Sequence, residues 1–463
     1  MYEFRIPEDF LIGTAHSAFQ SEGAWERDGK SESVMEHYAK KYAGKPFPYP
    51  SVVNPDAPIA LVTEDLPDRG CHFYDQYEDY IADMKQTGQN TFRLSLAWPR
   101  IIPTGYGAVN PKGIEYYNKV IDKLLENGIT PLVDLMHWDM PQCLQDEGGG
   151  FRNPKFPEWF EAYAKVCFEA FGDRVRLWST FNEASVMVNT GYHNGRFPPF
   201  EKSLEGSRLA AHNLILAHFR AVRVFRSLGL PGKIGAVHAI SPVYPAQVND
   251  ADVGAAARQC MYKFDWYMGP MAEGKYPEKL LQECPEILEA MPPHFREDLE
   301  EWFAPMDFVG LNYYYTKRSG YRSDNILRSK FAEDFYSQPD SKYKPYPAGM
   351  QDAIVGTWQR YGLEIYITEN GIGLQDTHDE ETDCNDEVRI SYLREHLRMV
   401  VRCIRLGIPV KGYYYWDDAD CYEMLTGLSH RFGLTWVDYE TGRRRWKKSR
   451  YYFSEICKSK MVD

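Results

Sequence analysis

Short apolar and β-branched runs recur along the chain, with amphipathic stretches between them. A parallel strand that is covered on both faces has a nearly continuous apolar sequence, and the run Thr-Pro-Leu-Val-Asp-Leu-Met at 130–136 is an example. Runs of this kind predict eight strands, at 10–15, 90–97, 130–136, 176–181, 233–238, 307–312, 364–368 and 410–415.

The stretches between these runs have the periodicity of helices. Within 116–126 one helical face carries Val120, Ile121, Leu124 and Leu125. The segment 207–228 repeats the pattern, and Gly128 and Pro131 mark the passage from a helix to the next strand. Strands that alternate with helices indicate a mainly parallel sheet. Eight such units predict one α/β domain over residues 1–463, a single (β/α)8 TIM barrel with long loops at its C-terminal face.

The gaps between some predicted strands are long. The gaps at 237–307 and 313–364 exceed what one helix needs, so we expect extra elements in the loops after the fifth and sixth strands. The stretch 40–66 is rich in Pro, Tyr and Gly and predicts a long loop insertion.

Charge and cysteine content narrow the class of protein. The net charge of −13 argues against nucleic acid or an anionic membrane surface as a partner. No apolar run approaches the ~18 residues of a membrane span. Acidic residues stand near the start, where a signal peptide would be apolar. Nine scattered cysteines without a CxxC pair predict reduced thiols in the cytoplasm. The basic run 443–448 predicts a solvated turn. The sequence leaves open whether the protein forms a homo-oligomer.

Polar and aromatic residues follow the predicted strands. In a TIM barrel the working groups lie at the carboxyl ends of the strands. Two carboxyl groups, Glu183 and Glu369, end the fourth and seventh strands, nearly opposite each other across the mouth. The other strand ends contribute His16, Gln20, Arg93, Trp98, His137, Trp138, Asp139, Asn182, Asn312, Tyr314, Tyr315, Asn370, Trp416, Asp417 and Asp418.

A pair of carboxyl groups is what glycoside hydrolysis needs, because one protonates the leaving oxygen and the other attacks the anomeric carbon. Aromatic residues make up 15% of the chain, and their rings suit the C–H faces of sugars. From the spacing of the two glutamates alone, the chain could also be another hydrolase or an isomerase with a barrel fold. His16, His137 and His238 lack the spacing of metal ligands, so we expect no metal site. For Asp417 and Asp418 we expect solvation at the outer rim.

Two motifs, Thr180-Phe-Asn-Glu183 and Ile367-Thr-Glu-Asn-Gly371, resemble the signatures of glycoside hydrolase family 1, the β-glucosidase family. The resemblance runs in order along nearly the whole chain and includes the segments 13–23, 92–100, 137–142, 310–314 and 431–439. It implies a single (β/α)8 barrel, retention of configuration, and no metal or organic cofactor.

The resemblance also implies roles for individual residues. Glu183 would be the acid/base and Glu369 the nucleophile, with Arg93 and Tyr314 keeping Glu369 charged and oriented. Asn182 would bind the sugar 2-hydroxyl. The remaining positions that match the family's sugar site are Gln20, His137, Trp138 and Glu423, with Trp416 as the platform beneath the ring and Asn312 in support.

Three departures from the family pattern leave the substrate open. Met424 stands where the family usually has Trp, and a thioether gives up the N–H that an indole could donate. Tyr343 stands at the usual Trp of the leaving-group site, and Ala184 replaces a Pro. The phospho-β-glycosidase branch would have Ser in place of Glu423, with Lys and Tyr at the positions that we align with His430 and Leu428.

We therefore expect a retaining exo-β-glycosidase that removes terminal sugars from small or aryl glycosides. The alternatives are a 6-phospho-β-glycosidase and a carbohydrate-binding protein of the same fold without catalysis. Transglycosylation, in which a sugar or alcohol replaces water, would use the same chemistry.

Overall fold

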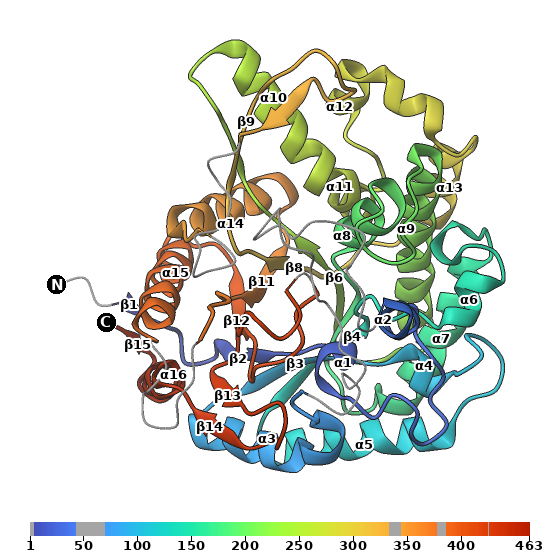
Figure 1. Ribbon diagram of the computed structural model, residues 1–463. Helices are drawn as coiled ribbons and strands as arrows, with labels where there is room; N and C mark the ends of the chain where they lie inside the picture. The colour runs from blue at the N-terminus through green and yellow to red at the C-terminus, as the bar shows by residue number, and fades with distance from the viewer. Residues whose placement is uncertain (1–3, 43–69, 333–343, 377–385, 425) are drawn as a thin grey trace.

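The barrel is built from strands spread over the whole chain. The computed structural model describes residues 4–42, 70–332, 344–376, 386–424 and 426–463. Eight parallel strands in these ranges close in the order β11-β12-β2-β3-β4-β5-β6-β8 (Figure 1). Their bounds are β2 (Leu11–Ala15), β3 (Thr91–Ser95), β4 (Thr130–Met136), β5 (Leu177–Asn182), β6 (Lys233–Ala239), β8 (Phe308–Asn312), β11 (Glu364–Asn370) and β12 (Val410–Trp416). The predicted (β/α)8 TIM barrel is confirmed.

Helices surround the strands (Figure 1). The larger ones are α3 (Phe73–Thr87), α5 (Pro111–Glu126), α7 (Phe156–Phe171), α9 (Leu204–Ser227), α14 (Pro347–Tyr361), α15 (Glu387–Arg405) and α16 (Lys448–Ser459). In α5 the Asn110 side chain caps the amide of Lys112, and Gly128 follows the helix at a φ of 72°. Of the predicted apolar face, Val120, Ile121 and Leu124 are fully buried, whereas Leu125 is exposed.

The long loops contain the expected extra elements. After β6 come β7 (Val243–Pro245), α10 (Asp250–Cys260), the π-helical turn η4 (Met261–Asp265), α11 (Trp266–Glu273), α12 (Glu278–Glu283) and α13 (Phe295–Trp302). After β8 come β9 (Lys317–Tyr321) and β10 (Ser329–Phe331). The two loops join, because β7 pairs with β9 in a three-stranded sheet.

Two local expectations differ from the structure. Lys40–Tyr42 end the helix α2 (Val34–Tyr42) instead of opening a loop, and 43–66 lie outside the described residues. The basic run 443–448 is not a solvated turn. It contains β14 (Arg444–Trp446), which pairs with β13 (Thr435–Val437), and it continues into the fully buried side chain of Lys447.

The ends of the described chain meet. Strand β1 (Phe4–Arg5) pairs antiparallel with β15 (Met461–Val462), beside α15 and α16 (Figure 1). Across the described ranges no helix combines the length and apolar character of a membrane span. The eight described cysteines are free thiols.

Candidate active site

The carboxyl ends of the barrel strands open into a cavity of about 350 Å³. Of the predicted site residues, Gln20, His137, Trp138, Asn182, Glu183, Asn312, Tyr314, Glu369, Trp416, Glu423 and Met424 line it. Arg93 is fully buried and contacts several of these residues from β3. Tyr343 lies outside the described residues.

Glu369, near the end of β11, is bound by two donors. Nη1 of Arg93 lies 2.6 Å from Oε1, and the Tyr314 hydroxyl donates to Oε2 at 2.7 Å. Arg93 also pairs with Asp134 of β4 at 2.5 Å, so one guanidinium joins two carboxylates. Burial raises the pKa of Glu369, while Arg93 and Tyr314 act in the opposite direction by stabilising the charged form.

Glu183 has a different environment. It stands between β5 and the short helix α8 (Ala184–Met187), in the left-handed conformation with φ 52° and ψ 53°. Such a backbone is uncommon for a residue with a side chain and is concentrated at functional sites. Among the described residues, its carboxyl group accepts one side-chain hydrogen bond, from Asn312 Nδ2 to Oε1 at 3.0 Å. Burial, and then the charge of Glu369, raise the pKa of Glu183 to about 8.

A row of amide contacts links the two glutamates to His137. The Oδ1 atom of Asn182 accepts from Arg93 at 2.8 Å and from Asn312 at 2.9 Å. The amide nitrogen of Asn182 therefore faces Nε2 of His137, at 2.9 Å. Burial, and then Arg93, hold the pKa of His137 well below its ordinary value.

This arrangement fixes the tautomer of His137. The neutral ring accepts at Nε2 from the Asn182 amide and carries its proton on Nδ1. Nδ1 is buried and has no hydrogen-bond partner among the described residues.

One side of the cavity comes from β2, β4 and the loop after β12. The Gln20 amide donates to the Tyr422 carbonyl at 2.7 Å, and the rings of His137 and Trp416 stack with centroids 5.5 Å apart. Met424 packs in an apolar cluster with Phe19, Trp25, Phe197 and Tyr422. The Trp138 indole donates to the Asn182 carbonyl at 3.1 Å.

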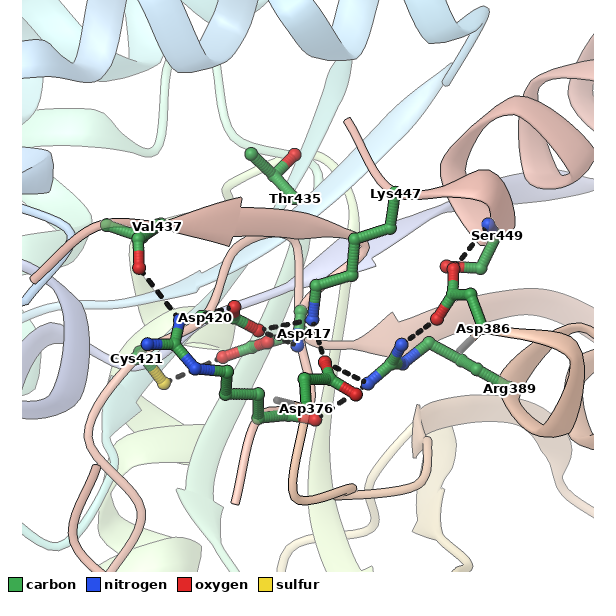
Figure 2. Close-up of polar contacts among 12 residues, drawn as sticks. Asp376, Asp386, Arg389, Asp417, Asp420, Cys421, Thr435, Val437, Lys447 and Ser449 are labelled. Carbon is green, nitrogen blue, oxygen red and sulfur yellow. Dashed lines mark hydrogen bonds and ion pairs between the residues drawn. The ribbon is translucent and has the colours of Figure 1, made fainter. Parts of the chain in front are cut away.

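A buried ion network supports the loop after β12. Figure 2 shows the Lys447 ammonium between Asp420 of this loop and Asp376, at 2.8 and 2.7 Å. Arg389 binds Asp376 and also Asp386 (Figure 2). Because Asp420 precedes Glu423 and Met424 by a few residues, the network fixes the segment that presents them to the cavity.

The structure corrects the expectation for Asp417 and Asp418. Both side chains are buried, not solvated at the rim. The Cys421 thiol donates to Asp417 at 2.7 Å, and Asp418 accepts from Thr14 at 2.9 Å and pairs with Arg450 at 3.2 Å. Their partners are distant in sequence except for Cys421, so the sequence alone does not indicate the burial.

One residue behind the cavity and three that line it were not predicted from the sequence. Asp134 supports Arg93, and its signal is a charged residue inside the otherwise apolar run 130–136. Lys263 and Lys317 come from the long loops after β6 and β8, and Arg196 comes from the segment after β5. These three cations line the cavity although no motif marks them.

Known proteins resemble this chain along its full length. The family model described as Glycosyl hydrolase family 1 matches residues 2–462. A 1,4-beta-D-glucan glucohydrolase of Thermotoga neapolitana is 35% identical over 459 residues, 98% of each chain. A 6-phospho-beta-galactosidase of Clostridium acetobutylicum is 32% identical over 488 aligned positions, again 98% of each. The solved family 1 β-glucosidase from Thermotoga maritima superposes with a TM-score of 0.91, at 34% identity and with full coverage of both chains.

Proposed function

The chain belongs to glycosyl hydrolase family 1 and is a retaining β-glucosidase-like enzyme, and from this premise we propose that Glu369 is its nucleophile and Glu183 its acid/base. The observation that supports these roles is the contrast between the two carboxyl groups. Glu369 has a guanidinium and a hydroxyl that favour its charge, whereas Glu183 has a single amide donor and a pKa raised to about 8. Near neutral pH the proton therefore resides on Glu183.

The first step uses this difference. The Glu369 carboxylate attacks the anomeric carbon, the glycosidic C–O bond breaks, and Glu183 gives its proton to the departing oxygen. The product is an ester between the sugar and Glu369. Asn182 would bind the 2-hydroxyl, where a contact strengthens as positive charge develops on the ring.

The second step depends on the loss of a charge. Esterification removes the negative charge of Glu369, which is one cause of the raised pKa of Glu183. Glu183 is then a carboxylate that accepts a proton from water as the water oxygen attacks the anomeric carbon. The ester bond breaks, Glu369 regains its charge, and Glu183 is protonated again.

We propose that the terminal sugar lies against the β12–β2–β4 side of the cavity. There Gln20, Glu423 and the Nδ1–H of His137 would bind the outer hydroxyls, with Trp416 beneath the ring and Trp138 and Met424 bordering it. Asn312 supports both Asn182 and Glu183. For Tyr343 the leaving-group role stays a prediction from the sequence.

The test combines two variants with a covalent label. We expect Glu369→Ala to lower kcat/KM for 4-nitrophenyl β-glucoside by on the order of 10³-fold or more. A 2-fluoro glucoside should label Glu369, detected by peptide mass spectrometry. Glu364→Ala is the matched control, because Glu364 begins the same strand and pairs with Lys233. Full activity of Glu369→Ala, or a label on another residue, would contradict the assignment.

A non-phosphorylated terminal sugar is part of the proposal. Glu423 lines the cavity, and neither Leu428 nor His430 does. A carboxylate there repels a 6-phosphate. A screen of 4-nitrophenyl β-glycosides (gluco, galacto, fuco, manno, xylo, glucurono and 6-phospho) tests this, and a dominant rate on the 6-phospho substrate would favour the phospho branch. Absence of turnover on every glycoside would favour the non-catalytic alternative, and product analysis at high acceptor concentration would detect transglycosylation.

We also propose a cytoplasmic protein with one catalytic domain over residues 1–463. The nine scattered cysteines and the net charge of −13 support a reducing compartment and a small-molecule partner. Cell fractionation and sedimentation would test the compartment and the homo-oligomer that the sequence leaves open.

A further inference from the structure

Three cationic side chains line one part of the active-site cavity. Lys317 begins β9, Lys263 lies in η4, and Arg196 follows the π-helical turn η3 (Val188–His193). They share the cavity with Glu183 and Glu369, so a molecule bound for catalysis can reach them.

The two lysines face each other and aromatic rings instead of carboxylates. Lys317 Nζ lies 5.2 Å from the ring centre of Tyr315 and 4.7 Å from that of Phe331, and Lys263 Nζ lies 4.5 Å from Phe331. Within the described ranges no carboxylate forms an ion pair with Lys263, Lys317 or Arg196. A cation in such surroundings lacks the opposite charge that partly buried cations usually have.

Burial and the neighbouring positive charges both affect the pKa values of the two lysines. Burial, and then the charge of Lys317, lower the pKa of Lys263 to about 7. Burial also lowers the pKa of Lys317, and Arg196 acts in the same direction. An anion placed between these groups would relieve their repulsion and restore the charge of Lys263.

The position of the cations identifies which part of a substrate they would meet. Arg196, Lys263 and Lys317 follow β5, β6 and β8, three consecutive strands of the barrel. The proposed proton donor Glu183 comes from the same arc, and it must face the oxygen of the leaving group. The groups assigned to the terminal sugar, among them Gln20 and Glu423, come from the opposite arc of β12, β2 and β4.

We propose that this enzyme acts on β-glycosides whose leaving group is anionic, with a carboxylate or a phosphate that binds Lys263 and Lys317 and has Arg196 beside it. The inference rests on the proposed function, because it uses Glu183 to define the leaving-group side. It is separate from the phospho-glycosidase alternative, in which the phosphate belongs to the terminal sugar.

Three disaccharides with the same terminal glucose test the proposal. They are cellobiose, 4-O-β-glucosyl-glucuronate, and cellobiose with a phosphate on O6 of its reducing-end glucose. Only the group at C6 of the leaving sugar differs, so released glucose gives comparable kcat/KM values. We expect about a tenfold or larger preference for at least one anionic substrate, since hydrogen bonds between charged groups are stronger than those between neutral groups. Whichever anionic disaccharide is preferred shows whether the site binds a carboxylate or a phosphate. The preference should fall in 0.5 M NaCl, because salt screens the charges.

Variants assign the preference to the lysines. Lys263→Gln, Lys317→Gln and the double variant should bring the ratio of anionic to neutral kcat/KM toward one, and Lys317→Arg should retain it. Lys165→Gln is the matched control, because it removes the same charge from an exposed position on α7 and should leave the ratio unchanged. The Lys317→Arg variant also separates a charge effect from misfolding.

The outcomes separate this inference from the proposed function. If aryl and disaccharide β-glucosides turn over without an anionic preference, or the double variant keeps the preference, the inference is wrong and the function stands. If none turns over, the function fails, and calorimetric titration with glucuronate and glucose 6-phosphate decides the inference. Binding to the wild type that the double variant loses would support an anion site, and no difference between the two proteins would overturn it.

Discussion

Among single residues, Asn312 lowers the pKa of Glu183, the proposed proton donor. Its amide donates to Glu183 at 3.0 Å and stabilises the charged form, against the burial that raises the pKa of Glu183 to about 8. The first step needs protonated Glu183, so kcat/KM should be high below this pKa and fall as pH rises through it. Asn312→Ala removes the donor and should move the alkaline limb upward by about one pH unit.

The pH profile separates this effect from simple damage to the site. Asn312 also donates to Asn182, so we expect the maximum rate to fall as well. Thr368→Val, which removes the hydroxyl that donates to Asn312 Oδ1 at 2.7 Å, should shift the limb less and in the same direction. Glu183→Gln should abolish the limb. A limb that stays in place or moves to lower pH in Asn312→Ala would contradict the role of the amide.

A substitution at Met424 tests how the terminal sugar is recognised. It is 4% exposed, lines the cavity and packs against Phe19, Trp25 and Tyr422. Met424→Trp would add an N–H donor and should raise the preference for gluco over other 4-nitrophenyl β-glycosides. The larger ring should also cost about 1–3 kcal/mol of stability. Met35→Trp in the same cluster, away from the cavity lining, is the control, and unchanged relative rates in Met424→Trp would defeat the prediction.

At the scale of elements, the barrel strands were predictable and their loops were not. Each predicted strand lies within two residues of the observed bounds, because parallel strands covered on both faces have uninterrupted apolar sequences. The loop after β6 gave no such pattern, because the pairing of β7 with β9 depends on a second loop about 70 residues further along. Lys263 and Lys317 lie in these loops, so no local pattern in the sequence places them in the cavity.

The Lys447 network supports a prediction about the loop after β12. Burial opposes charge at Asp376, and yet Lys447 and Arg389 lower its pKa to about 2. Lys447→Met would leave Asp376 and Asp420 without their shared cation, at a cost of about 3–5 kcal/mol in the free energy of unfolding. The KM for β-glucosides should rise because the loop presents Glu423 and Met424.

Urea unfolding and steady-state kinetics measure the two effects. Lys448→Met is the control, since Lys448 is the next residue and is exposed, and we expect a change within about 0.5 kcal/mol. Equal stability of Lys447→Met and the wild type would show that the network contributes nothing net to the fold.

In the molecule as a whole, the sequence predicted the barrel and the position of Glu183 and Glu369 at strand ends, but it did not predict which charged residues are buried. The basic run 443–448 and the pair Asp417 and Asp418 carry the charge pattern of a surface. Within these segments Lys447, Asp417 and Asp418 are buried. Lys447 binds Asp376, 71 residues away, and Asp418 pairs with Arg450. Local sequence shows the charge of a residue and not the distant partner that compensates its burial.

The pairing of β1 with β15 is a further long-range contact, and it closes the molecule. Val462 is 2% exposed opposite Phe4, and the Ile6 amide donates to the Lys460 carbonyl at 2.8 Å. Removal of residues 461–463 should lower the free energy of unfolding by about 2–4 kcal/mol, from lost apolar burial and strand hydrogen bonds. The active-site cavity lies at the carboxyl ends of the barrel strands and contains none of these residues, so kcat/KM of the folded fraction should persist. Asp463→Asn is the control, because its ion pair with Arg394 is exposed and should contribute less than about 1 kcal/mol. A truncated protein with unchanged urea unfolding would show that the pairing follows from the fold without stabilising it.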